Sequence, residues 1–104
     1  MLIVPLQAIP NQSVNIQLGG QSCKIDCYQT SFGLFVDLYV SGVLIIGGVI
    51  GQNLNRIVRD LYLGFVGDLT FIDNEGSIDP DFTGLGARFS LAYLTPDELP
   101  PGQG

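Results

Sequence analysis

Hydrophobic and polar residues alternate with a period of two along most of the chain. The alternation is clearest over residues 14–18 and 23–28, which are separated by Gly19 and Gly20. A period of two is typical of β-strands that bury one face, and paired glycines suit a tight hairpin turn. The pattern therefore predicts an antiparallel hairpin that places both cysteines on one face with Ile25.

A second hairpin is predicted over residues 34–40 and 43–46, with Ser41 and Gly42 at the turn. Its first strand alternates so that one face is aliphatic and the other carries polar and aromatic side chains. We expect this hairpin to form much of the core. The glycine pair that follows, Gly47-Gly48, lies in an apolar run and indicates a β-bulge or a close backbone approach. The predicted inward residues are Leu34, Val36, Leu38 and Val40, and the other face carries Phe35, Asp37 and Tyr39.

Two further strands are predicted over residues 68–73 and 87–94, with an acidic, glycine-containing loop over 74–86. Residues 52–63 are ambiguous. Their apolar positions recur at the i, i+3, i+4, i+7 spacing of a helix, yet the run is also rich in residues that suit a strand. The pattern leaves both readings open.

These elements predict an all-β fold, either a small antiparallel β-sandwich or a barrel, with one possible short helix near residues 52–62. Residues 1–12 contain Pro5 and Pro10, which have no N–H for a sheet, so we expect an N-terminal arm or an edge strand there. Residues 13–94 are expected to form one β domain. Residues 95–104 contain three prolines and are expected to be an exposed tail.

Composition excludes several function classes. The 104 residues include ten acids and four bases, for a net charge of −6, which argues against direct binding to nucleic acid. The chain has no histidine, so Ser-His-Asp and Cys-His nucleophiles and histidine-ligated metals are not available. The longest apolar stretch, residues 43–51, is too short to span a membrane, and no secretion signal is evident. We therefore expect a soluble protein made in a cytoplasm.

The cysteines and the acidic loop do not indicate a disulfide, a metal site or a catalytic site. Cys23 and Cys27 on one strand would lie about 13 Å apart, too far for a disulfide, so free thiols in a reducing compartment are predicted. The acidic run 73–81 resembles a calcium loop only loosely, because glycine and the final bidentate acid fall at the wrong positions. We predict no catalytic, cofactor-binding or metal-binding residues and favour a solvated turn.

The sparse charge suggests instead that other chains cover part of the surface. Only 13% of the residues are charged, whereas a small domain usually covers itself with charge. Candidate contacts lie on the arm, on the aromatic face of the predicted core hairpin and at two arginines, and they suit strand addition or wrapping. The alternative is that uncharged polar side chains simply cover the outside. The candidates are Val4, Pro5, Leu6, Gln7, Pro10, Phe35, Tyr39, Arg56 and Arg59.

A set of short motifs in a fixed order resembles the phage baseplate plug family of contractile-tailed bacteriophages. The resemblance spans roughly residues 2–94, and the order of the motifs carries it, because each motif alone is short. The motifs are residues 4–12, 37–42, 56–65, 67–69, 73–76, 79–81 and 83–89. The all-β context of the resemblance favours extended chain over helix at residues 52–63.

The resemblance implies a structural virion protein at the tail tip. It would be a plug or ring subunit that joins or seals the tail tube against the hub or spike, with other tail and baseplate proteins as partners and copies of itself in a closed ring. Synthesis would take place in the host cytoplasm. The alternatives are a small β module that binds glycan or calcium, a baseplate-associated glycan-cleaving domain, or an unrelated monomeric β domain.

Overall fold

The computed structural model describes residues 1–59 and 65–98, and all statements on structure below refer to these residues. They form strands and short 3-10 turns, with no α-helix. The strands are β1 (Leu2–Val4), β2 (Asn11–Leu18), β3 (Gln21–Thr30), β4 (Gly33–Val40), β5 (Val43–Ile50), β6 (Asp68–Asp73) and β7 (Phe89–Leu94). The 3-10 turns span Phe82–Gly84 and Pro96–Glu98. The predicted all-β class is confirmed.

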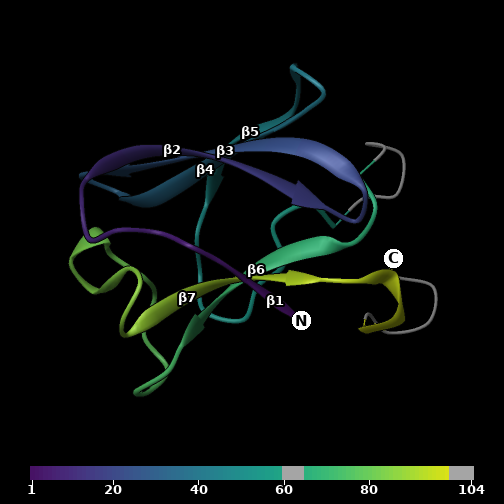
Figure 1. Cartoon of the computed structure of the whole chain (residues 1–104). Helices are drawn as coiled ribbons and strands as arrows, with labels where there is room; N and C mark the ends of the chain where they lie inside the picture. Colours follow the sequence, from purple (N-terminus) through teal and green to yellow (C-terminus); the bar gives the residue numbers. More distant parts are fainter. Residues whose placement is uncertain (60–64, 99–104) are drawn as a thin grey trace.

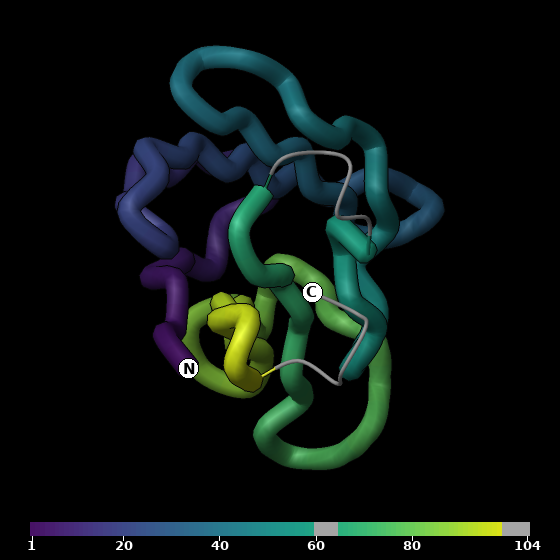
Figure 2. Tube along the Cα trace, turned by 90° about the vertical axis from the view of Figure 1, so that its right-hand side faces the viewer, coloured from purple at the N-terminus to yellow at the C-terminus, as the bar shows by residue number. Residues whose placement is uncertain are grey.

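The strands form two antiparallel sheets that face each other. One sheet has the order β2-β3-β4-β5, and the other has the order β1-β7-β6. Figure 1 shows the four-stranded sheet above and the three-stranded sheet below, and Figure 2 shows the same two layers after a quarter turn. The described residues do not close into a barrel, so the open two-sheet form of the prediction holds.

Two-residue turns fix the register of the four-stranded sheet. Gly19 and Gly20 both adopt positive φ (60° and 77°), as do Ser41 and Gly42 (51° and 81°). Turns with two left-handed residues match the twist of the strands that they join. Leu18 consequently pairs with Gln21, and the predicted alternation is preserved along β2 and β3.

The core lies between the inward faces of the two sheets. The inward residues of β3 and β4 meet aromatic and aliphatic side chains from β6 and β7. Most residues of β6 and β7 are buried whichever face they occupy, so burial does not alternate along these strands. The largest fully buried side chains are Phe71, Leu18, Ile25, Leu34, Leu38, Leu69 and Leu91.

The second hairpin is core on β4 but not throughout β5. Leu34, Val36 and Leu38 are buried as predicted, whereas Val43 and Leu44 at the start of β5 are 61% and 52% exposed. The predicted core hairpin therefore contributes to the core through β4, and these two residues of β5 lie outside it. Leu44 pairs with Tyr39 and therefore lies on the outer face of the sheet, away from the core, and Val43 directly follows the turn at Ser41-Gly42.

The predicted bulge at Gly47-Gly48 is present. Between the pairs Val36–Val49 and Leu38–Ile46, β5 has one residue more than β4. Gly48 takes a positive φ of 67°, which an L side chain rarely adopts, and its N–H donates to Asp37 Oδ1 at 2.7 Å. The bulge therefore bends β5 around a carboxylate of β4.

The ambiguous segment is neither a helix nor a regular strand over its described part, residues 52–59. Asn53 and Arg56 form isolated bridges to β6, and the N–H of Ile57 donates to the carbonyl of Leu69. The possible helix near residues 52–62 is absent from this part, while residues 60–62 lie outside the described chain. Ile57 and Val58 are buried against the core, whereas Leu54, which shares their helix-like spacing, is 66% exposed.

Candidate interaction surface

The four-stranded sheet has two open edges, β2 and β5. Within the described chain β2 pairs with β3 alone and β5 pairs with β4 alone. Each edge strand has eight residues, and neither contains a charged residue or a proline. Edge strands of monomeric proteins usually carry charge, proline or both, because these prevent pairing with another chain. The two edges of this sheet lack charge and proline, and β5 is interrupted only by its bulge.

Edge strand β5 also carries exposed apolar side chains. Val43, Leu44 and Ile50 are 61%, 52% and 38% exposed. Leu44 pairs with Tyr39 and Ile50 pairs with Phe35, so both side chains share the outer face of the sheet with these aromatic residues. The apolar surface of β5 is therefore continuous with the aromatic face that the sequence singled out.

Cross-strand contacts order that outer face. The rings of Tyr28 and Phe35 are stacked, with centroids 6.1 Å apart. The ammonium group of Lys24 lies 4.3 Å from the centroid of the Tyr39 ring. The predicted outward orientation of Phe35 and Tyr39 is confirmed, and both side chains are half-buried by these neighbours.

Two carboxylates face each other in the middle of the outer face. Asp26 of β3 pairs directly with Asp37 of β4, and like charges in this position destabilise a sheet. The Tyr28 hydroxyl donates to Asp37 Oδ1 at 2.9 Å. Burial, together with this hydrogen bond and the charges of the two carboxylates, raises the pKa of Tyr28. The charges of this sheet thus lie on its two central strands.

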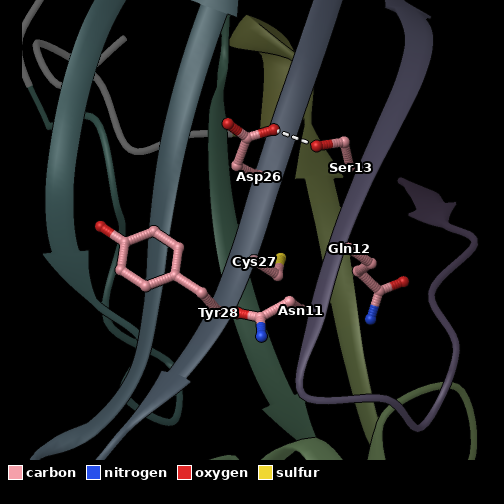
Figure 3. Close-up of a pocket in the computed structure, with 6 residues that line it drawn as sticks. All are labelled: Asn11, Gln12, Ser13, Asp26, Cys27 and Tyr28. Atoms are coloured by element: carbon pink, nitrogen blue, oxygen red, sulfur yellow. Dashed lines mark hydrogen bonds between the residues drawn. The ribbon is translucent and has the colours of Figure 1, made fainter.

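A shallow hollow of about 470 Å³ borders the β2–β3 hairpin. Figure 3 shows its lining, in which the Ser13 hydroxyl donates to Asp26. The thiol of Cys27 also borders the hollow, but this residue is buried, and burial together with the nearby carboxylates raises its pKa to about 12. A thiol with that pKa is protonated at neutral pH and is not a nucleophile. The lining residues are Asn11, Gln12, Ser13, Asp26, Cys27 and Tyr28.

Both cysteines are free and buried on the inward face of β3, as the alternation predicts. Burial also raises the pKa of Cys23. The two thiols thus behave as small core side chains.

The N-terminal arm divides into buried and exposed residues. Val4 and Leu6 are 2% and 8% exposed and pack into the chain's own core. Pro5, Gln7 and Pro10 are exposed. The backbone N–H and carbonyl of Gln7 both bond to the side chain of Gln12, at 3.0 and 2.7 Å, which ties the arm to β2. The exposed members of the arm remain candidates for contact.

The two candidate arginines lie beside β6, on a different element from the aromatic face. Arg56 bridges Thr70, and the guanidinium Nε of Arg59 donates to the carbonyl of Arg56. The N–H of Arg59 donates to Asp68, a buried carboxylate. Asp60, the acid next to Arg59 in the sequence, lies outside the described residues. The predicted contact residues thus fall on three elements.

The acidic loop is occupied by its own hydrogen bonds. The Arg88 guanidinium binds Asp73 through two bonds of 2.8 and 2.9 Å, and the N–H groups of Glu75 and Ile78 donate to the same carboxylate. This network holds the pKa of Asp73 well below its usual range, the Arg88 bonds being the largest cause. Asp79 accepts from the N–H of Asn53 at 3.0 Å. These carboxylates cap turns, and the predicted solvated turn is wrong for Asp73, which is buried and bound by Arg88.

Two features escaped the sequence reasoning. The first is the open β5 edge, for which a signal existed, because residues 43–53 contain no charge. The second is the pair of buried carboxylates Asp68 and Asp73, each of which accepts several backbone or guanidinium N–H groups. Nothing in the spacing of these residues marks their partners, since Arg88 lies 15 positions from Asp73.

The described residues contain neither a metal-binding cluster nor a membrane-spanning helix. They contain no group of three or more cysteine, aspartate or glutamate side chains placed to hold a metal. They also contain no helix with the length and apolarity required to cross a membrane.

A protein-family model matches nearly the whole chain. The family model described as cyanophage baseplate Pam3 plug gp18 matches residues 1–97. A search of curated proteins finds no match. The family match covers both sheets and almost the whole chain.

Proposed function

Because the chain belongs to the cyanophage baseplate plug family and has a structural role in a phage baseplate, we propose that it is a plug or ring subunit at the tail tip. In this role it joins or seals the tail tube against the hub or spike. Copies of the chain form a closed ring, and neighbouring baseplate proteins cover the rest of its exposed apolar surface.

The observation that carries the proposal is the uncharged, apolar edge of the four-stranded sheet. Val43 and Leu44 are more than half exposed on a strand without any charge. A monomer with such an edge is prone to aggregate, whereas a subunit fixed in a larger assembly has this edge covered.

The described surface offers a binding face more readily than a catalytic centre. The thiol beside the hollow is protonated, and the carboxylates of the 73–81 loop are engaged in turns. These arrangements support a non-catalytic role. None of them favours the glycan-cleaving or the calcium-binding alternative.

Cryo-electron microscopy of intact virions tests the proposal. We expect the two-sheet fold on the tail axis between tube and hub, recognisable by the stacked Tyr28 and Phe35 side chains. Mass spectrometry of the same purified particles provides the matched check that the chain is present. A position at the periphery of the baseplate, or absence of the chain from the particles, would overturn the proposal.

A further inference from the structure

We propose that the four-stranded sheet continues from one copy to the next, with the β5 edge of each subunit pairing with the β2 edge of its neighbour. This inference rests on the proposed ring and identifies the surfaces that close it. The occupant of the β5 edge is thus a second copy of this chain.

Strand direction supports this pairing. The sheet contains four strands in antiparallel order, so β2 and β5 run in opposite directions. Rotation about an axis roughly parallel to the strands preserves strand direction, and the β2 of the next copy therefore lies antiparallel to β5. Both edges have eight residues. Every second residue of an edge strand directs its N–H and C=O away from its single partner, which leaves a matching row of groups on each edge.

Charge supports the same pairing. Because each copy has a net charge of −6, two copies repel each other in most relative orientations. The charges of this sheet, Lys24, Asp26 and Asp37, lie on the central strands β3 and β4, and both edges are free of them. Copies that meet edge to edge therefore avoid placing one charged strand beside another.

The bulge supplies the curvature that a closed ring needs. β-Bulges and glycine kinks bend a strand and increase its twist, and sheets that close on themselves use them for this purpose. Gly47-Gly48 bends β5 at the edge, and Asp37 holds the bend by accepting from the N–H of Gly48. The neighbour's strand would pair with β5 on both sides of this bend.

Disulfide trapping in virions tests the pairing. Leu44 lies on the outer face of β5, and three exposed residues of β2 lie on the outer face at the opposite edge: Ser13, Asn15 and Gln17. Leu44→Cys is combined with Ser13→Cys, Asn15→Cys or Gln17→Cys in turn, and the particles are oxidised. The native thiols are buried and stay in place as a background. We expect one combination to give a ladder of covalent oligomers on a non-reducing gel.

Controls separate this proposal from the alternatives. Ile78→Cys with Asn15→Cys is matched in exposure, since Ile78 is 50% exposed on a loop, and should give no ladder. If Leu44→Cys alone gives dimers and no combination gives a ladder, β5 pairs with β5 around a two-fold axis and the proposal is wrong. The proposal also fails if the particles contain the chain but no combination links. Absence of the chain from particles contradicts the proposed function instead.

A charge variant tests the same edge without oxidation. Leu44→Lys places an ammonium group at the β5 edge, and we expect incorporation into particles to fall about tenfold or more, since burying an unpaired charge is costly. Ile78→Lys is the control and should be incorporated normally. Thermal melts of both purified variants verify that each folds. Equal incorporation of the two variants would contradict the pairing.

Discussion

The two sheets differ in how they treat their polar groups and edges. In the three-stranded sheet, Asp68 and Asp73 are buried and every oxygen of their carboxylates has a donor within the chain. On the four-stranded sheet, two carboxylates face each other at the surface and the open edges carry no charge. On its β6 side the first sheet is bonded to residues 53–57 of the same subunit, and its other edge is the three-residue strand β1, on which Leu2 and Ile3 are about half exposed. The second sheet has two eight-residue edges that present backbone and uncharged side chains to a partner.

In this small domain, the polar interactions that stabilise the fold lie in one sheet, and the longer open edges that are available for assembly lie in the other. Val58 and the loop before β7 are attached to the three-stranded sheet through its buried carboxylates, and the side-chain oxygen of Asn53 accepts from the backbone N–H of Asp73. Substitutions there should destabilise the subunit. Substitutions on the β5 edge should leave the subunit folded and act on assembly.

The largest effect is expected for Asp68→Ala. Its carboxylate accepts from the N–H groups of Val58, Arg59 and Leu69 at 2.7–2.9 Å. Removing the acceptor leaves these donors without a partner in or near the core, at a cost of about 3 kcal/mol. Urea denaturation measures the change in the free energy of unfolding. Asp26→Ala, at the surface, is the matched control, and an equal loss for both variants would erase the contrast between the sheets.

Acid should act through Asp73. Its pKa is lowered in the folded protein, so the stabilisation is present above the ordinary aspartate pKa of about 4 and is lost as the pH falls below that value. We expect the melting temperature to drop between about pH 4 and pH 2. Asp73→Asn should melt lower at pH 7 and show a smaller drop over this window. If the melting temperatures of the wild type and of Asp73→Asn fall by the same amount over this pH range, Asp73 is not the cause of the acid sensitivity.

Thiol reactivity should report the burial of β3. With a pKa of about 12, the Cys27 thiol has roughly a thousandfold less thiolate at pH 8 than a cysteine of ordinary pKa near 9. We expect negligible labelling of the folded chain by a thiol reagent and rapid labelling of two thiols in urea. Leu44→Cys provides an exposed thiol as the positive control. Fast labelling of native Cys27 would show that the four-stranded sheet opens readily.

The smallest effect is expected for Asp26→Asn. The substitution removes the like charge opposite Asp37 but weakens the bond from Ser13, so the free energy of unfolding should change by no more than about 0.5 kcal/mol. Relief of repulsion should make the change more favourable at low salt than at high salt. A loss as large as that of Asp68→Ala would mean that this face is as essential to the subunit as the buried carboxylates.

Local pattern was sufficient to predict most strands. Residues 68–73 form β6 as predicted, and the turns at Gly19-Gly20 and Ser41-Gly42 follow from residue type. These features depend on residues that are close in the sequence, so the local pattern is sufficient to predict them. The same alternation also placed Phe35 and Tyr39 on the outer face.

Long-range placement was not predictable in the same way. Leu44 is an apolar residue of a type common in cores, and only its pairing with Tyr39, beyond a register shift in β5, shows that it lies on the exposed outer face. The apolar positions of residues 52–59 fit a helix by spacing, yet Asp68 accepts from the N–H groups of Val58 and Arg59 and holds this end of the segment beside β6. Such partners lie about ten residues away in sequence, and no short pattern records them.

Hydrogen exchange of the β5 amides, in the free chain and in assembled baseplates, tests the central claim most directly. In the free chain we expect peptides from Val43–Ile50 to exchange faster than those from Asp68–Asp73, because half of the edge amides face solvent. In baseplates the β5 peptides should become as protected as β6. If the β5 amides exchange equally fast in both states, no partner strand covers this edge and the account is contradicted.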